Sequence, residues 1–273
     1  MFADRLRSIL FDHYGVKHPL SFFECGQFAG TVTCRGCDDT TRAVKHCSKK
    51  WCPLCQHRII RKRADELREW VKIIPQPKLV TVTARNTEKI SRTYLRKFNV
   101  ALWKLRRQKV FSLVRGGVQS IEVTNEGRGW HAHAHLVVDA RWIDQRDLSI
   151  AWGKLVGQDF AIVDVRDKRD LNAAQQAAKY VCKPGQMVKW PAHEIAAFIE
   201  SISGVRLFNA FGSMAKQRPA IRAALEISRA PRVCDCGCED FLFASPHLTA
   251  TEKIERTIER YESHAQRELN GAT

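Results

Sequence analysis

The chain has 273 residues, of which 44% are hydrophobic, enough to bury one large core or two small ones. Its 45 lysines and arginines exceed its 29 acids and give a net charge of +16, which favours a nucleic-acid partner over the alternative of a basic protein without one. The sequence has no apolar run long enough to span a membrane and no signal-peptide core, so we expect a cytoplasmic protein without a membrane partner.

The N-terminal quarter of the chain is rich in cysteine. Residues 1–24 predict a short helical or irregular lead-in. Residues 25–57 hold six of the ten cysteines, with turn-forming residues and little apolar periodicity. In a reducing compartment this composition indicates a small module held by metal. Residues 58–74 repeat apolar side chains at helical spacing, and the prolines at 75–77 end that helix.

The middle of the chain alternates between strand and helix patterns. The predicted elements are strand 78–84, helix 91–108, strand 117–124, strand 130–140, helix 142–157, strand 160–166 and helix 170–183. Asp144 and Asp170 are the expected N-caps of the last two helices. The first six elements follow the ferredoxin-like order of an α+β fold, an antiparallel sheet with helices on one face.

The C-terminal part predicts helices over 191–227, interrupted at "FNAFGS", and an exposed helix over 251–269. We therefore expect three regions. Residues 1–74 form a zinc-binding module with a basic helix, residues 75–217 form the main α+β domain, and residues 218–273 form a C-terminal extension with the cysteine cluster "CDCGC".

The predicted strand 130–140 carries three histidines in alternation. His131, His133 and His135 share one face, because side chains two residues apart in a strand point to the same side. Glu122 lies on the preceding strand of the same hairpin and is the obvious third ligand for an ion held by two of the imidazoles. Two imidazoles and a carboxylate suit a catalytic Mn²⁺ or Mg²⁺, and zinc is possible on ligand type. The alternative is a polar strand face that binds no metal.

Tyr180 lies on the predicted helix that follows, in "AAKYVCKP". Lys183 is three residues later on the same helical face and can supply a cation beside a reacting phenol. A tyrosine nucleophile activated in this way attacks phosphate esters. Taken alone, a tyrosine on an amphipathic helix is more often a core residue.

Together, these motifs resemble the HUH endonucleases, which initiate rolling-circle replication by nicking one DNA strand. The similarity is greatest to the plasmid initiators with one active tyrosine, and it covers roughly residues 34–216. The motifs that carry it are "LVTVT", "IEVT", "GWHAHAH", "KYVCKP" and "GVRLFNAFGSMAK", in that order.

The resemblance implies a role for each residue of the histidine strand and the tyrosine helix. His133 and His135 would be the paired metal ligands, Glu122 the third and His131 an accessory residue. Tyr180 would attack the phosphate and keep the 5′ end as a phosphotyrosine, which frees a 3′-OH to prime synthesis, with help from Lys183.

One position departs from the family pattern. Some members carry a glutamate one turn before the tyrosine, and two-tyrosine transposases and relaxases use a second tyrosine near there. This chain has Gln176. A paired-tyrosine mechanism in this helix is therefore not expected, and the termination step is open.

Two CxxC motifs predict zinc. Cys34-x2-Cys37 and Cys52-x2-Cys55 are separated by 14 residues, a spacing typical of zinc knuckles. Six cysteines are enough to hold part of a second site. The further candidate ligands are Cys47, Cys25, His46 and His57. The pattern also resembles the zinc-binding segment found beside this nuclease in related replication proteins and transposases.

Basic residues follow the second motif directly. Zinc would hold this helix start near DNA, where its side chains contact phosphates; they are Arg58, Arg61, Lys62 and Arg63. The later cysteines Cys234, Cys236 and Cys238, with His247, are candidates for another zinc site on ligand type alone.

Three functions compete. The leading one is a strand-nicking and strand-transferring initiator that acts on single-stranded or cruciform origin DNA with the host helicase and polymerase. A transposase or relaxase with the same core is the second, and Gln176 and the modest length argue against it. A zinc-ribbon DNA-binding protein without enzyme activity is the third, but it leaves the histidine strand unexplained.

Overall fold

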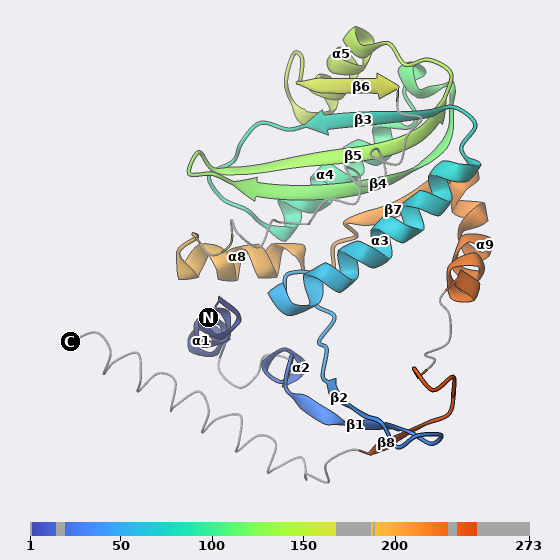
Figure 1. Cartoon of the computed structure of the whole chain (residues 1–273). Coiled ribbons are helices and arrows are strands. Elements are labelled where there is room, and N and C mark those ends of the chain that lie inside the picture. The colour runs from blue at the N-terminus through green and yellow to red at the C-terminus, as the bar shows by residue number, and fades with distance from the viewer. Residues whose placement is uncertain (1, 15–19, 168–186, 188, 229–233, 245–273) are drawn as a thin grey trace. The chain divides into compact units, whose positions relative to one another are not determined.

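The computed structural model describes residues 2–14, 20–167, 187, 189–228 and 234–244 (Figure 1). The chain forms two compact units, each with its own sheet. One consists of residues 57–228, and the other combines residues 1–56 with residues 229–273. This division differs from the three expected regions, because the C-terminal segment pairs with the N-terminal one and most of the basic helix belongs to the larger unit.

The larger unit is built on a five-stranded antiparallel sheet of order β6-β3-β5-β4-β7. The strands are β3 (Pro77–Thr83), β4 (Val114–Asn125), β5 (Trp130–Ala140), β6 (Val163–Asp167) and β7 (Phe208–Gly212). The first four have the ferredoxin-like arrangement, in which β3 and β5 lie side by side and are joined through a helical segment and β4. The predicted α+β fold with an antiparallel sheet is therefore confirmed.

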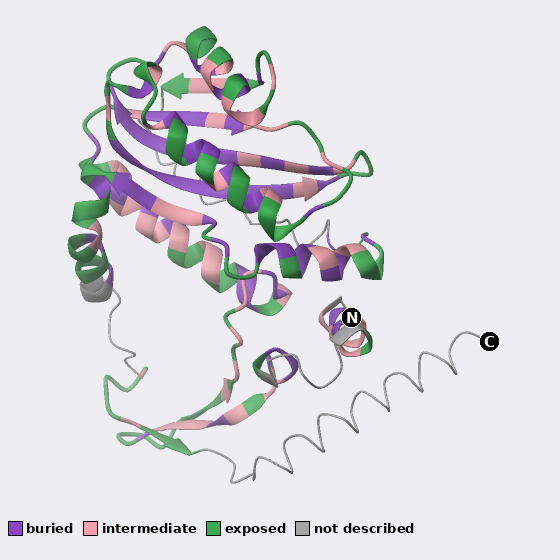
Figure 2. Cartoon of the chain, turned by 180° about the vertical axis from the view of Figure 1, so that it is seen from behind, coloured by how far each residue is buried: buried purple, intermediate pink, exposed green. Residues whose placement is uncertain are grey.

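Helices cover both faces of this sheet. They are α3 (Pro53–Ile73), α4 (Arg92–Leu105), α5 (Gln145–Val156), α8 (Ala192–Ile202) and α9 (Ser213–Ser228), with a short 3₁₀ helix η2 (Lys109–Phe111). Figures 1 and 2 show α4 and α5 on one face and α3 on the other. The expected N-cap of α5 is present, since the Asp144 carboxylate accepts a hydrogen bond of 2.8 Å from the Asp147 amide.

Side chains alternate between the two faces of β5, and this determines which residues pack on each face of the sheet. Ala132, Ala134 and Leu136 are fully buried on one face. Val137 lies on the opposite, histidine face, where it joins a hydrophobic core with residues of α3 and α9 such as Trp70 and Met214. Helices α3 and α9 thus cover the Val137 end of the face that also carries the histidines.

One expected break is a strand. The first five residues of "FNAFGS" form β7, which pairs with β4 through Gly117 opposite Phe211 and Gln119 opposite Asn209. The helices expected over 191–227 form as α8 and α9, and the expected interruption between them is this strand. Glycine at 117 explains the close packing, because a Cβ there would lie 2.5 Å from the Val137 carbonyl oxygen on the neighbouring strand.

The smaller unit has a three-stranded antiparallel sheet of order β2-β1-β8. Its described elements are α1 (Phe2–Tyr14), α2 (Leu20–Phe23), β1 (Phe28–Cys34), β2 (Thr40–Val44) and β8 (Phe241–Ala244). Phe22 and Trp51 pack edge to face, with ring centroids 4.5 Å apart. Across both units, no described helix has the length and apolar character needed to cross a membrane.

Candidate metal centre and cysteine clusters

The β4–β5 hairpin places the predicted acidic ligand beside the histidines. Glu122 on β4 lies directly opposite His133 on β5, and Ser120 lies opposite His135. Because residues two apart share a strand face, all four side chains are on the same side of the sheet. The turn that closes this hairpin contains Gly127 and Gly129, both with positive φ, which favours glycine.

Three ligand atoms converge at this point. The Glu122 Oε2 lies 2.7 Å from the His133 Nε2 and 3.3 Å from the His135 Nε2. The Glu122 and His135 side chains are buried, and His133 is half-buried. Two ligands about 2.1 Å from one ion lie about 3 Å apart, so these three side chains are spaced as ligands of a single divalent ion.

Electrostatics favours the charged form of the carboxylate. Burial alone would raise the pKa of Glu122, but hydrogen bonds with His133 and His135 and the attraction of the imidazoles outweigh it and lower the pKa to about 2. Glu122 is therefore an anion over the physiological pH range, which is the form that binds a metal.

The neighbouring strand orients one of the histidines. Thr81 on β3 lies opposite His135, and its hydroxyl Oγ1 is 3.1 Å from the Nδ1 of that ring. This contact occupies Nδ1 and leaves Nε2 facing Glu122. The Ser120 hydroxyl is buried on the same face and has no hydrogen-bond partner among the described residues.

His131 lies beside the three-residue group and is not part of it. Its ring centroid is 5.1 Å from that of His133. Burial, followed by repulsion from His133, lowers its pKa. His131 is thus poised as a neutral neighbour of the candidate metal site.

Tyr180, Lys183 and Gln176 lie outside the described residues, and so does the whole predicted helix 170–183. Their predicted roles remain proposals.

The structure separates the two CxxC motifs. The first cysteine cluster consists of Cys25, Cys47, Cys52 and Cys55, and the second cysteine cluster consists of Cys34, Cys37, Cys234 and Cys236. In each, the four sulfur atoms lie within 4.8 Å of one another. Each CxxC motif therefore has its own partners: Cys52 and Cys55 group with Cys25 and Cys47, and Cys34 and Cys37 group with Cys234 and Cys236.

Both cysteine clusters can hold a metal such as zinc. Cys25 and Cys47, which the sequence left as competing ligands, complete the first cluster. Cys234 and Cys236 complete the second, while His247 lies outside the described residues. Sequence spacing does not reveal the second cluster, because its two halves are nearly 200 residues apart.

The basic residues of α3 differ in their exposure. Arg58, Arg61 and Lys62 are exposed, as phosphate contacts require. Arg63 is half-buried, with its guanidinium 5.5 Å from the ring centroid of Phe208, and burial lowers its pKa. Arg63 thus packs against β7.

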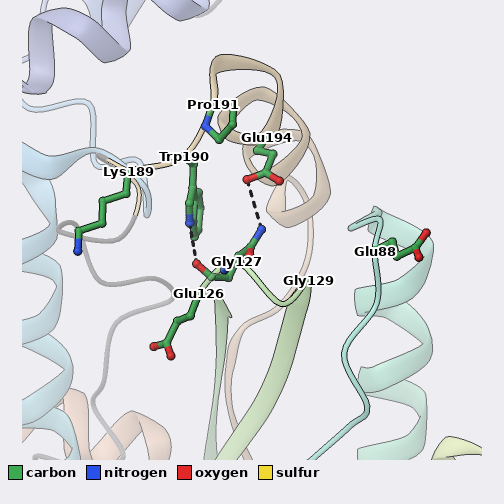
Figure 3. A pocket seen from close by; sticks show the side chains of 9 residues that line it. Glu88, Glu126, Gly127, Gly129, Lys189, Trp190, Pro191 and Glu194 are labelled. Atoms are coloured by element: carbon green, nitrogen blue, oxygen red, sulfur yellow. Dashed lines mark hydrogen bonds between the residues drawn. The ribbon is translucent and has the colours of Figure 1, made fainter.

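A separate pocket of about 820 Å³ lies at the β4–β5 turn, beside the start of α8 (Figure 3). Trp190 donates a hydrogen bond of 2.9 Å from its indole to the Asn125 carbonyl, and the Asn125 amide lies 3.3 Å from a Glu194 oxygen. Glu88 and Glu126 also line it. This acidic lining is unsuited to phosphate, and the candidate metal ligands are not part of it.

Comparison with known proteins identifies the family. Residues 39–223 match the model of a family described as "Replication protein". The matched region covers more than half of the chain and includes β4, β5 and the segment of Tyr180. Neither the curated proteins nor the solved structures compared with the chain gave a match. The chain belongs to the replication protein family, the family of plasmid rolling-circle initiators.

Proposed function

We propose that this protein initiates rolling-circle replication by nicking single-stranded or cruciform origin DNA and later rejoining the strands. The observation that carries the proposal is the group of Glu122, His133 and His135, whose ligand atoms converge from two adjacent strands. It lies within the region that matches the replication protein family. A protein that only bound DNA would have no need of this group.

The donor set fits a divalent cation. Two imidazole nitrogens and one carboxylate oxygen would hold Mn²⁺ or Mg²⁺. When bound, such an ion polarises the scissile phosphate and offsets the charge that develops on its oxygens. Thr81 holds the His135 ring in orientation, and His131 lies beside the ligand group.

Tyr180 is the proposed nucleophile. Its phenolic oxygen forms a bond to phosphorus as the bond between phosphorus and the 3′ oxygen breaks. The phenol loses its proton, and the departing 3′ oxygen gains one, leaving a 5′-phosphotyrosine and a free 3′-OH. Lys183 stabilises the phenolate by its charge. Attack by a 3′-OH on the phosphotyrosine reverses these steps and rejoins DNA.

The basic helix start and the cysteine-rich unit are proposed to hold the DNA. Arg58, Arg61 and Lys62 are exposed and would contact phosphates. Structural zinc would stabilise the folded form of the cysteine-rich segment that precedes this helix. The free 3′-OH would then be passed to the host helicase and polymerase in the cytoplasm.

A covalent adduct tests the proposal. The full chain is incubated with single-stranded origin DNA and Mn²⁺, and the products are separated under denaturing conditions. We expect a protein–DNA adduct that Tyr180→Phe abolishes. Tyr261→Phe is the matched control and should keep it, because Tyr261 lies beyond the family match. His133→Ala combined with His135→Ala should also remove the adduct.

Two results would contradict the proposal. An adduct that survives Tyr180→Phe excludes Tyr180 as the nucleophile. DNA binding without any adduct, in every divalent metal tried, favours a zinc-ribbon DNA-binding protein instead.

A further inference from the structure

We propose that the second cysteine cluster binds one zinc ion, which joins two segments of the chain that lie nearly 200 residues apart. Cys34 is the last residue of β1, Cys37 lies in the turn after it, and Cys234 and Cys236 come from the segment before β8. The four residues belong to the same compact unit. This site is independent of the proposed DNA chemistry.

The sulfur spacing fits a single tetrahedral ion. The Sγ atoms of Cys34 and Cys236 are 3.6 Å apart, and those of Cys37 and Cys234 are 3.5 Å apart. Four sulfurs about 2.3 Å from one zinc ion would be about 3.8 Å apart. A disulfide needs about 2.05 Å, so these cysteines are not bonded to one another. A cluster of several irons would need its cysteines farther apart.

The backbone around the sulfurs supports the thiolate form that zinc requires. The Gly36 amide points at the Cys34 sulfur, with 3.3 Å between nitrogen and sulfur. An N–H group directed at sulfur stabilises the negative charge of a thiolate. On the other side, the Gly237 amide donates to the Cys234 carbonyl at 2.7 Å and closes a tight turn. Gly237 has a φ of +87°, which favours glycine.

Gly36 allows the two cysteine loops to approach. A Cβ at position 36 would lie 2.9 Å from the Cys238 Cβ and 3.2 Å from the Cys238 sulfur. Real Cβ contacts are not that short, so a side chain at this position would push the loops apart. The glycine at position 36 therefore leaves the space that the C-terminal loop occupies.

Strand pairing brings the two loops together independently of the sulfurs. β8 pairs with β1 in antiparallel register, with Cys34 opposite Phe241 and Thr31 opposite Ala244. The Arg35 amide also donates to the Asp240 carbonyl at 3.0 Å. The β1–β8 ladder thus ends at the cysteines, and a metal bound there would link the two segments beyond the last hydrogen bond.

The first cysteine cluster forms a second, complete ligand set. Its sulfurs are 3.4 Å apart for Cys25 and Cys55, 3.6 Å for Cys25 and Cys52, and 3.7 Å for Cys47 and Cys55. Two complete four-sulfur sets predict two zinc ions per chain. A single ribbon built from both CxxC motifs predicts one.

Metal content distinguishes these predictions. Zinc and iron are measured per chain in the purified full-length protein, and we expect two zinc ions and no iron. The paired changes C34S/C37S, C234S/C236S and C52S/C55S should each leave one zinc ion. Combining C34S/C37S with C234S/C236S should still leave one, because both remove the same ion. Combining C34S/C37S with C52S/C55S should leave none.

The remaining ion serves as an internal control for folding. Cys238→Ser is the matched single change in the same loop and should keep two zinc ions, because Cys238 is not among the four grouped sulfurs. If C234S/C236S keeps both ions, or if the wild-type chain holds one, the proposal is wrong. The same holds if Cys238→Ser loses an ion that Cys236→Ser keeps, because Cys236 would then not be a ligand.

Gly36→Ala gives a test that removes no ligand. We expect a chelator to extract one of the two zinc ions from this variant several-fold faster than from the wild type, with the other ion unchanged. Extraction of both ions at the wild-type rates would contradict the contact between the two loops. The covalent adduct is a separate measurement, so failure here would leave the proposed nicking reaction standing.

Discussion

The hydroxyl of Thr81 lies 3.1 Å from the Nδ1 of His135, across the β3–β5 ladder. This contact fixes which nitrogen of the ring faces Glu122, whose carboxylate is 3.3 Å from the Nε2 on the other side. A hydrogen-bonded partner behind a metal-binding histidine holds the ring in orientation and raises its affinity for the ion. Thr81 is therefore a positioning residue for the candidate metal centre.

Replacing Thr81 with valine should weaken Mn²⁺ binding about tenfold or more, because the valine keeps the shape of the side chain and loses its hydroxyl. Calorimetric titration of the full chain with Mn²⁺ measures this. Thr81→Ser keeps a hydroxyl and should bind within a few-fold of the wild type. Equal affinities for the valine and serine variants would exclude the positioning role.

Glu122 should make the stability of the metal-free protein depend on pH. Its pKa is lowered to about 2 from an ordinary value of 4.5. A carboxylate with a lowered folded pKa stabilises the fold fully above its unfolded pKa, and this contribution is lost as pH falls through the folded pKa. The stability difference between wild type and Glu122→Gln should thus shrink, by an amount on the order of a few kcal/mol, between pH 4.5 and about 2. Urea unfolding at several pH values tests this, and a constant difference would contradict it.

The indole hydrogen bond of Trp152 should add to the stability that the packing of its ring provides. It is fully buried, and its indole donates a hydrogen bond of 2.6 Å to the Thr83 carbonyl at the end of β3. Trp152→Phe should lower the free energy of unfolding by about 1–3 kcal/mol, because this donor is lost. Trp103→Phe is the comparison, since Trp103 is half exposed and should change stability by about 0.5 kcal/mol or less. Similar losses in both variants, measured by urea unfolding, would show that the hydrogen bond contributes little.

The exposed basic residues of α3 should act through salt-dependent phosphate contacts. Changing both Arg61 and Lys62 to alanine should weaken binding to all single-stranded DNA sequences and lower the slope of log affinity against log salt by about 1.4, or about 0.7 per contact. Arg63→Ala should leave this slope near the wild-type value and reduce stability instead, because its guanidinium packs over Phe208. Fluorescence anisotropy at several salt concentrations measures the slope, and an unchanged slope in the double variant would contradict the role of the helix.

Short stretches of sequence were enough to predict the β5 strand, its partner residue on β4 and a helix cap. The alternation of β5 was clear enough to give its bounds, Trp130–Ala140, and the strand pair placed Glu122 opposite His133 as the alternation required. Asp144 caps α5 with its own side chain, as predicted, because a capping signal stays within a few residues.

Contacts between segments that are far apart in the chain could not be predicted from the sequence. β7 is a five-residue strand between two helices, and it exists because β4 offers an edge beside Gly116 and Gly117. The CxxC spacing predicted metal binding, and both motifs lie in four-cysteine groups that could hold an ion, but the spacing left the other ligands of each motif open. The actual partners of Cys34 and Cys37 lie in a later segment that only strand pairing with β8 brings near.

The pairing of β1 with β8 also sets an order for the protein's synthesis. The ribosome makes β1 (Phe28–Cys34) long before β8 (Phe241–Ala244), with the whole larger unit, residues 57–228, translated between them. Domains generally fold as units while the chain is being made. The five-stranded sheet, with its histidine face, can therefore assemble on the nascent chain, whereas β1 must wait for its second neighbour until translation has passed residue 244. During that interval Cys34 at the end of β1, and Cys37 just after it, are without Cys234 and Cys236, the partners they group with in the folded chain.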